Sequence, residues 1–401
     1  MALSMATRKQ VTKEMAQRYV RARKRERGRM LDELCALTGY NRSYAARLLR
    51  LRARAPARPA GARRRDRGRI YGPETRAPLR KCWAVAGGIC GKRLAPFLPE
   101  LLAALERHQE IELSGEQREK LLAVSAATID RLLAGERRRA SLRGTSGTKP
   151  GSLLRSQIPV RTFAEWDHTQ VGFVEVDLVG HDGGSSRGDY CQSLDLTDVA
   201  SGWTEVRAVA NKAQRWCFEA LQLIEQRLPF ALLGLDSDNG SEFINAQLAR
   251  YCSEHQISFT RSRPYRKNDN CYVEQKNWTV VRRTVGWARY DTEAELATLN
   301  RLYEVLRLYV NYFQPQVKLI AKERSGARVR KHYDAPTTPY RRLLALEALT
   351  PPLARRLEEE YLALNPAALR RQITHLQRRL VELSSLKEAT RRKEVQASAS
   401  S

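Results

Sequence analysis

The sequence lacks long apolar runs, paired cysteines and a balancing number of acidic residues. No stretch of about 18 apolar residues occurs, so we expect no membrane-spanning helix. The first residues, MALSMATRKQVTKEMAQRYV, lack the apolar core of a signal peptide. The seven cysteines are scattered with no CxxC spacing, and an odd count without pairing favours reduced thiols in the cytoplasm over a disulfide framework.

The shortage of acidic residues is uneven along the chain. Lys and Arg together number 71 against 44 Asp and Glu, a formal net charge of +27. Residues 1–162 carry 37 basic and 14 acidic side chains, residues 163–290 carry 14 and 17, and residues 291–401 carry 20 and 13. This balance disfavours a small-metabolite enzyme and indicates a polyanionic partner. The blocks indicate ends that hold phosphates around a centre with another task, with basic arms for solubility as the alternative.

Residues 8–50 predict a helix, a tight turn and a second short helix. Gly39 suits the turn, and Asn41 is a suitable N-cap for the second helix. The pattern is typical of a helix-turn-helix unit, although any helical hairpin gives a similar outline. Given the local charge, we expect DNA binding by the outward side chains of the second helix, which are Arg42, Ser43 and Arg47.

A basic linker and a second helical unit follow. Residues 51–70 hold eight arginines with Pro and Gly and no apolar period, which predicts an extended linker. Its cluster Arg63, Arg64 and Arg65 is expected to contact DNA phosphates, while insertion of Arg67 and Arg69 into a minor groove is the alternative for the linker. Residues 73–134 repeat the helix-turn-helix outline, with Ser125 as N-cap and with Thr128 and Arg131 facing outward.

From Phe173 the pattern changes to the alternation of apolar and polar residues that is typical of half-buried strands. A mixed α/β domain is therefore expected. Its strands are expected at residues 173–179, 190–196, 203–209, 231–235 and 257–260, and its helices at residues 212–226, 245–255 and 271–287.

Three carboxylates stand at informative places in this α/β domain. Asp177 lies near the end of the first strand, Asp238 follows the fourth, and Glu274 begins the last helix, with 35 residues between Asp238 and Glu274. We expect the two aspartates to meet at one edge of the sheet and the glutamate to complete the cluster. Phosphodiester cleavage by two hard cations needs such oxygen ligands, and three acids repel one another until metal binds. The spacing therefore predicts a metal-dependent phosphodiester site.

The runs DSDNGSEF and SRPYRKNDNCYVEQKNW resemble the integrase core of DDE transposases and retroviral integrases. DLVGHDGG, LTDVASGWTE and GKRLAPFLPELLAALERH look like bacterial insertion-sequence transposases of this kind. The resemblance implies that Asp177, Asp238 and Glu274 are the catalytic residues and hold two Mg²⁺ ions, with Mn²⁺ able to substitute. The Asp-Asn-Gly register favours Asp238 over Asp236. Two departures are the loop Lys267–Cys271, where the family usually has small residues, and helix-turn-helix units in place of a zinc module.

The resemblance implies a multidomain chain in which α-helical helix-turn-helix modules precede an α/β RNase H-like integrase core and a basic C-terminal region. We expect the boundaries to be 1–55 for the first helix-turn-helix domain, 56–72 for a basic linker, 73–136 for the second, 137–162 for a linker, 163–315 for the core and 316–401 for the C-terminal region.

The predicted function is that of a DNA transposase that binds terminal inverted repeats and catalyses 3′-end cleavage and strand transfer. The alternatives are a structure-specific RNase H-like nuclease and a DNA-binding regulator that uses the core only for assembly. We expect a cytoplasmic, nucleoid-associated bacterial protein without a membrane partner that forms a homodimer or higher assembly on element and target DNA. By helical spacing and resemblance, Lys276 and Arg283 are expected on one DNA-contacting face.

Other residues carry plainer expectations. His181 is expected to be a hydrogen-bonding loop residue, and Asp195 and Asp198 to be exposed to solvent. The basic stretch 318–342 suits phosphate contact. A short heptad seam predicts a helix that packs either on its own chain or in a dimer, and its members are Leu369, Ile373, Leu376, Leu380 and Leu383.

Overall fold

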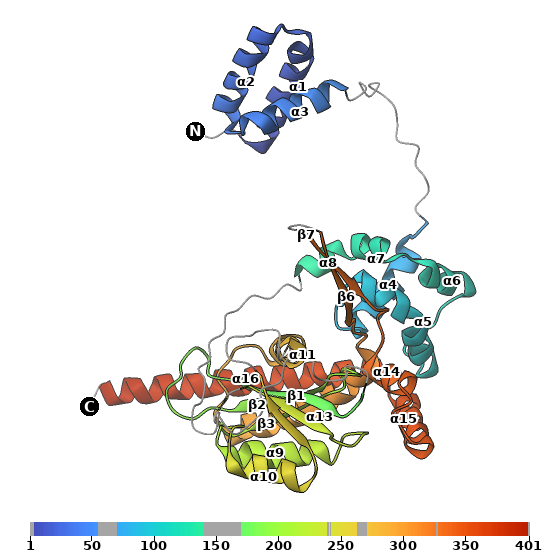
Figure 1. The fold of residues 1–401 in the computed structure, drawn as a ribbon, viewed down its shortest axis with the longest axis vertical. Coiled ribbons are helices and arrows are strands. Elements are labelled where there is room, and N and C mark those ends of the chain that lie inside the picture. Colours follow the sequence, from blue (N-terminus) through green and yellow to red (C-terminus); the bar gives the residue numbers. More distant parts are fainter. Residues whose placement is uncertain are drawn as a thin grey trace. The chain divides into compact units, whose positions relative to one another are not determined.

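The computed structural model describes residues 4–54, 70–139, 170–238, 240, 242–262, 271–325 and 328–399. The chain divides into two compact units, Met1–Ile70 and Tyr71–Ser401 (Figure 1). Each unit has its own buried apolar side chains. In the described ranges, no helix combines the length and the apolar character needed to cross a membrane.

The first unit contains three helices, α1 (Met5–Arg21), α2 (Lys24–Thr38) and α3 (Arg42–Arg54). The expected turn between α2 and α3 is confirmed, since Gly39 has a φ of 72° and Asn41 Oδ1 accepts the Ser43 N–H at 2.9 Å. The stretch expected as a single first helix is instead two, α1 and α2. The Arg27 side chain donates to the Tyr19 and Val20 carbonyls at 3.0 and 2.6 Å, which satisfies the end of α1.

Five helices open the second unit. They are α4 (Pro73–Val85), α5 (Gly91–Arg107), α6 (Gly115–Ala123), α7 (Ala126–Leu132) and α8 (Ala134–Arg139). Ser125 caps α7 as expected, with its Oγ accepting the Thr128 N–H at 3.3 Å. At Gly91 a Cβ would lie 2.1 Å from the Ala126 carbonyl oxygen, so only glycine lets α5 begin this close to α7. The apolar sides of α4 to α7 join the same hydrophobic cluster as the C-terminal helices.

A five-stranded mixed sheet forms the centre of the second unit (Figure 1). Its strands are β1 (Phe173–Gly180), β2 (Gln192–Asp198), β3 (Thr204–Val209), β4 (Gly234–Ser237) and β5 (Ser258–Arg261), in the order β3-β2-β1-β4-β5. β1 pairs antiparallel with β2 and parallel with β4. One face packs on α9 (Gln214–Glu225) and α10 (Ala246–Glu254). The five expected strands and the helices expected at residues 212–226 and 245–255 are thus confirmed in kind and order, with β4 beginning three residues later than predicted.

The stretch expected as one helix at residues 271–287 is three segments. α11 (Cys271–Lys276) leads into the π-helix η1 (Asn277–Arg282), and α12 (Arg283–Val285) follows. A π-helix in this position is rare and is often found at functional sites. The remaining elements are α13 (Glu293–Phe313), β6 (Leu319–Ser325), β7 (Arg328–Tyr333), α14 (Pro339–Ala345), α15 (Pro351–Ala363) and α16 (Pro366–Ala399).

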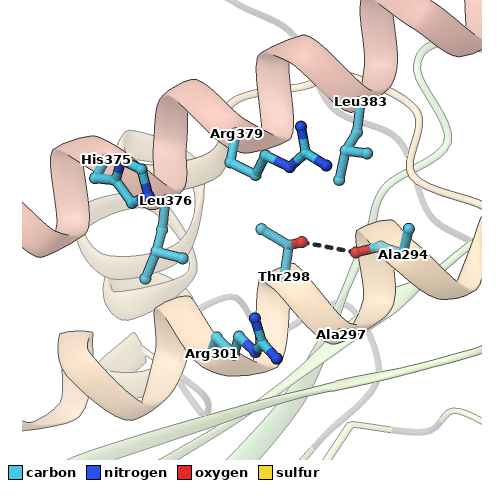
Figure 2. A pocket seen from close by; sticks show the side chains of 8 residues that line it. All are labelled: Ala294, Ala297, Thr298, Arg301, His375, Leu376, Arg379 and Leu383. Atoms are coloured by element: carbon cyan, nitrogen blue, oxygen red, sulfur yellow. Dashed lines mark hydrogen bonds between the residues drawn. The ribbon is translucent and has the colours of Figure 1, made fainter.

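The heptad seam packs on its own chain. Leu369, Ile373 and Leu380 of α16 are buried in the hydrophobic cluster of the second unit. Farther along α16, Lys387 Nζ binds the Glu295 carboxylate at 2.7 Å and so joins α16 to the start of α13. A groove of about 360 Å³ remains between the two helices, lined by Ala294, Ala297, Thr298 and Arg301 of α13 and by His375, Leu376, Arg379 and Leu383 of α16 (Figure 2).

Candidate active site

The two faces of the sheet differ in chemistry because side chains alternate along a strand. One face carries the apolar side chains that pack on α9 and α10. The other face carries Glu175 and Asp177 on β1, Asp195 opposite Asp177 on β2, and Asp236 opposite Glu175 on β4. This acidic face is covered in part by α11 and η1.

Asp177 lies where the expected site should be. Val176 pairs with Ser237 at the end of β4, so Asp177 and Asp238 follow side by side along these parallel strands. Burial raises the pKa of Asp177 to about 7, and the nearby carboxylates of Asp238 and Glu274 also raise it. Two donors hold the carboxylate in place, the Leu178 N–H at 2.8 Å and Asn277 Nδ2 at 2.7 Å.

Asp238 and Glu274 are presented differently. Asp238 is partly buried after β4, where the Gly240 N–H donates to its Oδ1 at 2.8 Å, and burial raises its pKa. Glu274 is exposed on α11. The structure therefore brings both carboxylates within electrostatic reach of Asp177. Across the residues that the structure describes, however, no three His, Cys, Asp or Glu side chains lie close enough together to hold a metal ion.

The donor chemistry of these residues nevertheless suits a hard divalent cation. All three carry carboxylate oxygens, the ligands that Mg²⁺ prefers. Their mutual effect on the pKa of Asp177 is the repulsion that a cation between them would relieve. Asp236, the competing aspartate, is fully buried and accepts a hydrogen bond from Thr260 Oγ1 at 2.6 Å, so it joins β4 to β5.

Glu175 was not singled out from the sequence. It is fully buried, and its Oε2 accepts the N–H groups of Tyr272 and Val273 at 2.9 and 3.0 Å. A carboxylate at this place satisfies the first turn of α11 and interacts favourably with the helix dipole. Glu175 therefore fixes the helix that carries Glu274 to the strand that carries Asp177. Its position two residues before Asp177, on the same strand face, was the available signal.

The prediction that Lys276 and Arg283 share one DNA-contacting face is wrong for Lys276, which is buried. Its side chain is only 5% exposed, and its Nζ donates to the Gly202 carbonyl at 3.2 Å. Burial lowers its pKa to about 7, although the nearby Asp195 carboxylate favours the charged form. Arg283 remains exposed and donates to the Gly87 carbonyl at 3.1 Å. The π-helix between them, with its wider hydrogen-bond spacing, removes the α-helical register on which the expectation depended.

The structure also decides the expectations for Asp195, Asp198 and His181. Asp195 and Asp198 are fully buried, so the expectation of solvent exposure is wrong. Asp198 instead accepts the N–H groups of Gly172 and Ser201 at 2.9 and 2.7 Å, and so holds the turn after β2. His181 is a hydrogen-bonding residue as expected, with its Nε2 2.7 Å from Ser193 Oγ, and burial lowers its pKa to about 3.

Most of the candidate DNA-binding residues of the helical modules lie at the surface of the structure. Arg42, Ser43 and Arg47 are exposed on α3, and Arg42 forms an ion pair with Asp32 of α2. Arg131 is exposed on α7 and donates to the half-buried Thr128 hydroxyl at 2.8 Å. The cluster of three arginines at 63–65 lies outside the described residues.

The sheet region of the chain is similar to known integrase cores. Residues 167–267 match the family model described as "Integrase core domain", a range that includes Asp177 and Asp238 and ends before Glu274. The catalytic core of BIV integrase is 17% identical and covers 44% of this chain and 95% of its own, with a TM-score of 0.29. The HTLV-2 integrase catalytic core domain, in complex with magnesium and in a dimeric form, is 14% identical and covers 36% and 88%, with a TM-score of 0.28.

A full-length relative extends the similarity beyond the core. The uncharacterized protein y4rM of Sinorhizobium fredii is 44% identical over 350 residues, which are 85% of this chain and 96% of the relative. The match therefore includes much of the helical and C-terminal regions as well as the sheet. The chain belongs to the family of the uncharacterized protein y4rM and has an integrase-like core of the DDE transposase type.

Proposed function

We propose that the protein is a transposase that binds the terminal inverted repeats of an insertion sequence, cleaves the 3′ ends and joins them to target DNA. The observation that carries the proposal is the position of Asp177 on β1, beside the end of β4 from which Asp238 follows. Burial and the carboxylates of Asp238 and Glu274 raise the pKa of Asp177 to about 7, which supports it. These carboxylates come from β1, the end of β4 and α11, so the fold gathers acids that are distant in sequence. Perturbed acids gathered in this way are typical of catalytic sites.

Each residue has a distinct task in this proposal. Asp177, Asp238 and Glu274 would hold two Mg²⁺ or Mn²⁺ ions, which supply a nucleophile at neutral pH and neutralise charge on the leaving oxygen. Asn277 orients the Asp177 carboxylate through the bond at 2.7 Å. Glu175 holds α11 against β1. Phosphoryl transfer asks little covalent chemistry of the protein, so positioning and charge neutralisation carry the rate.

The helical modules would select the DNA. Arg42 and Arg47 are exposed on the second helix of the helix-turn-helix outline, so each change to Ala is expected to weaken specific binding by about 1–3 kcal/mol if it contacts base edges. Changing Arg63, Arg64 and Arg65 to Ala should weaken all DNA binding alike and flatten its salt dependence. Two element ends must be held together, so we propose at least two protomers in the active complex.

The test uses the full chain and labelled duplexes taken from the DNA on both sides of its reading frame, with Mg²⁺, Mn²⁺ or EDTA. We expect cleavage and joining with metal only. Asp177→Asn, Asp238→Asn and Glu274→Gln should each lose both products while binding the duplexes as the wild type does. Asp189→Asn, which changes an exposed carboxylate of the same unit, is the matched control and should react normally.

Three results would contradict the proposal. Joining by Glu274→Gln at the wild-type rate would remove Glu274 from the site. Hydrolysis without joining would favour a structure-specific nuclease. Binding without cleavage under any metal would favour a DNA-binding regulator.

A further inference from the structure

β6 and β7 form a two-stranded antiparallel ribbon that is separate from the central sheet. Its apolar side chains are unusually exposed, with Ile320 68%, Val329 46% and Tyr333 51% accessible to solvent. An isolated hairpin is only marginally stable in water, and it gains little from apolar side chains that remain exposed. The ribbon therefore presents side chains to solvent that its own folding does not require.

The two faces of the ribbon carry different charge. Arg324 stands opposite Val329, and Lys331 and Tyr333 follow Val329 at intervals of two, so all four side chains share one face. The other face carries Glu323, opposite Arg330 and 3.1 Å from His332 Nε2. Among the side chains that the structure describes on the first face there is no carboxylate. That face, defined by Arg324, Val329, Lys331 and Tyr333, is the basic ribbon face.

The base of the ribbon is held firmly beside the candidate active site. Gln316 and Thr337 exchange backbone hydrogen bonds at 2.9 and 3.0 Å below the two strands. Lys318 Nζ donates to the Ala200 carbonyl at 2.8 Å and lies 5.9 Å from the ring centre of Tyr272 on α11. The ribbon thus emerges next to the helix that carries Glu274.

We propose that the basic ribbon face binds double-stranded B-form DNA and holds it for the active site. The argument rests on charge complementarity: Arg324 and Lys331 are exposed cations of a ribbon without a compensating carboxylate on that face. A two-stranded ribbon fits the major groove of B-DNA, whereas the deep, narrow major groove of duplex RNA does not admit it. Val329 and Tyr333 supply the apolar and aromatic contacts. This inference rests on the proposed function for its partner, and it adds an element outside the helical modules.

The test compares two double variants of the full chain. Arg324→Gln/Lys331→Gln removes two cations from the basic ribbon face, and Arg355→Gln/Arg356→Gln removes two exposed cations from α15 as the matched control. Binding of a labelled DNA duplex of arbitrary sequence is followed by anisotropy between low and high salt. If both ribbon cations contact phosphates, the slope of log affinity against log salt falls by about 1.8, equivalent to about 30-fold weaker binding at 0.15 M salt. The control should keep the wild-type slope.

The second arm uses duplex RNA of the same length as competitor. We expect it to displace the labelled DNA from the wild type less well than unlabelled duplex DNA does, and we expect this difference between the two competitors to be smaller for the ribbon variant. A ribbon variant that binds like the wild type, or a control that loses as much, would overturn the inference. So would equal competition by RNA with the wild type. None of these outcomes depends on catalysis. Glu274→Gln tests the proposed function without changing the ribbon, so the failure of the inference and the failure of the proposed function are distinguishable.

Discussion

Glu175 offers the sharpest structural prediction, because it joins the strand of Asp177 to the helix of Glu274. The perturbation is Glu175→Ala, compared with Glu175→Gln. In the alanine variant, the N–H groups of Tyr272 and Val273 lose the oxygen that accepts both of them at 2.9 and 3.0 Å. In the glutamine variant, an oxygen of similar position remains and only the negative charge is lost.

The magnitude follows from these contacts. A buried donor left without an acceptor costs about 1–3 kcal/mol. Because two N–H groups lose their acceptor, Glu175→Ala should destabilise α11, as packed on β1, by about 2–6 kcal/mol. Loss of the charge alone removes an interaction with the helix dipole worth about 0.3–2 kcal/mol, which sets the expectation for Glu175→Gln. Glu175→Ala should therefore destabilise α11 more than Glu175→Gln does.

Hydrogen exchange of the peptides that contain α11 and η1 measures this local opening. We expect strongly faster exchange there in Glu175→Ala, a smaller change in Glu175→Gln, and unchanged protection in α9. Glu219→Ala, on the exposed side of α9, is the control and should leave α11 protected. Wild-type protection of α11 in Glu175→Ala would refute the reasoning, since the two amide groups would then have no need of the carboxylate.

Three other predictions concern Asn277, Lys387 and the titration of Asp177. Asn277→Ala removes a bond that lowers the pKa of Asp177, so the acid limb of the activity profile should move to higher pH; an unchanged profile would exclude this orienting role. Lys387→Met leaves the buried Glu295 without its cation and should cost about 3–5 kcal/mol in urea unfolding, and a loss below 1 kcal/mol would contradict it. Because burial and neighbouring carboxylates raise the folded pKa of Asp177 to about 7, its ionisation opposes folding increasingly as the pH rises from about 4 to about 7. In EDTA, Asp177→Asn should therefore raise Tm at pH 8 and not at pH 4, and an equal effect at both would be inconsistent with the shift.

The sequence predicted the sheet well because alternation and chain order carry most of that information. The five strands of the central sheet and the helices α9 and α10 appear in the expected order, whereas β6 and β7 were not predicted. The parallel pairing of β1 with β4 places Asp177 beside Asp238. Helix caps were equally predictable, since Asn41 and Ser125 accept hydrogen bonds from N–H groups only two and three residues later. In the second unit, the helices α4 to α7 share a hydrophobic cluster with the C-terminal helices, and no local pattern carries such long-range packing.

Buried polar side chains were the least predictable feature. Asp195 and Asp198 read as exposed because aspartate is rarely buried without partners. Asp198 is buried because the backbone of Gly172 and Ser201, one of them 26 residues away, supplies the donors. Such partners become visible only when the sheet is formed, so polarity alone gave the wrong environment.

The π-helix explains the one error that bears directly on DNA binding. Lys276 and Arg283 are seven residues apart, a spacing that places two side chains on one side of a regular α-helix. Residues Asn277–Arg282 depart from that geometry, and Lys276 turns inward to the Gly202 carbonyl while Arg283 stays at the surface. The same segment lets Asn277 reach Asp177 at 2.7 Å. The π-helix thus leaves Lys276 buried and directs the Asn277 amide toward Asp177. We therefore expect Lys276→Gln to disturb the packing of α11 more than it weakens the salt dependence of DNA binding. A variant with normal protection of α11 and a slope flatter by about 0.9 would restore Lys276 as a phosphate contact.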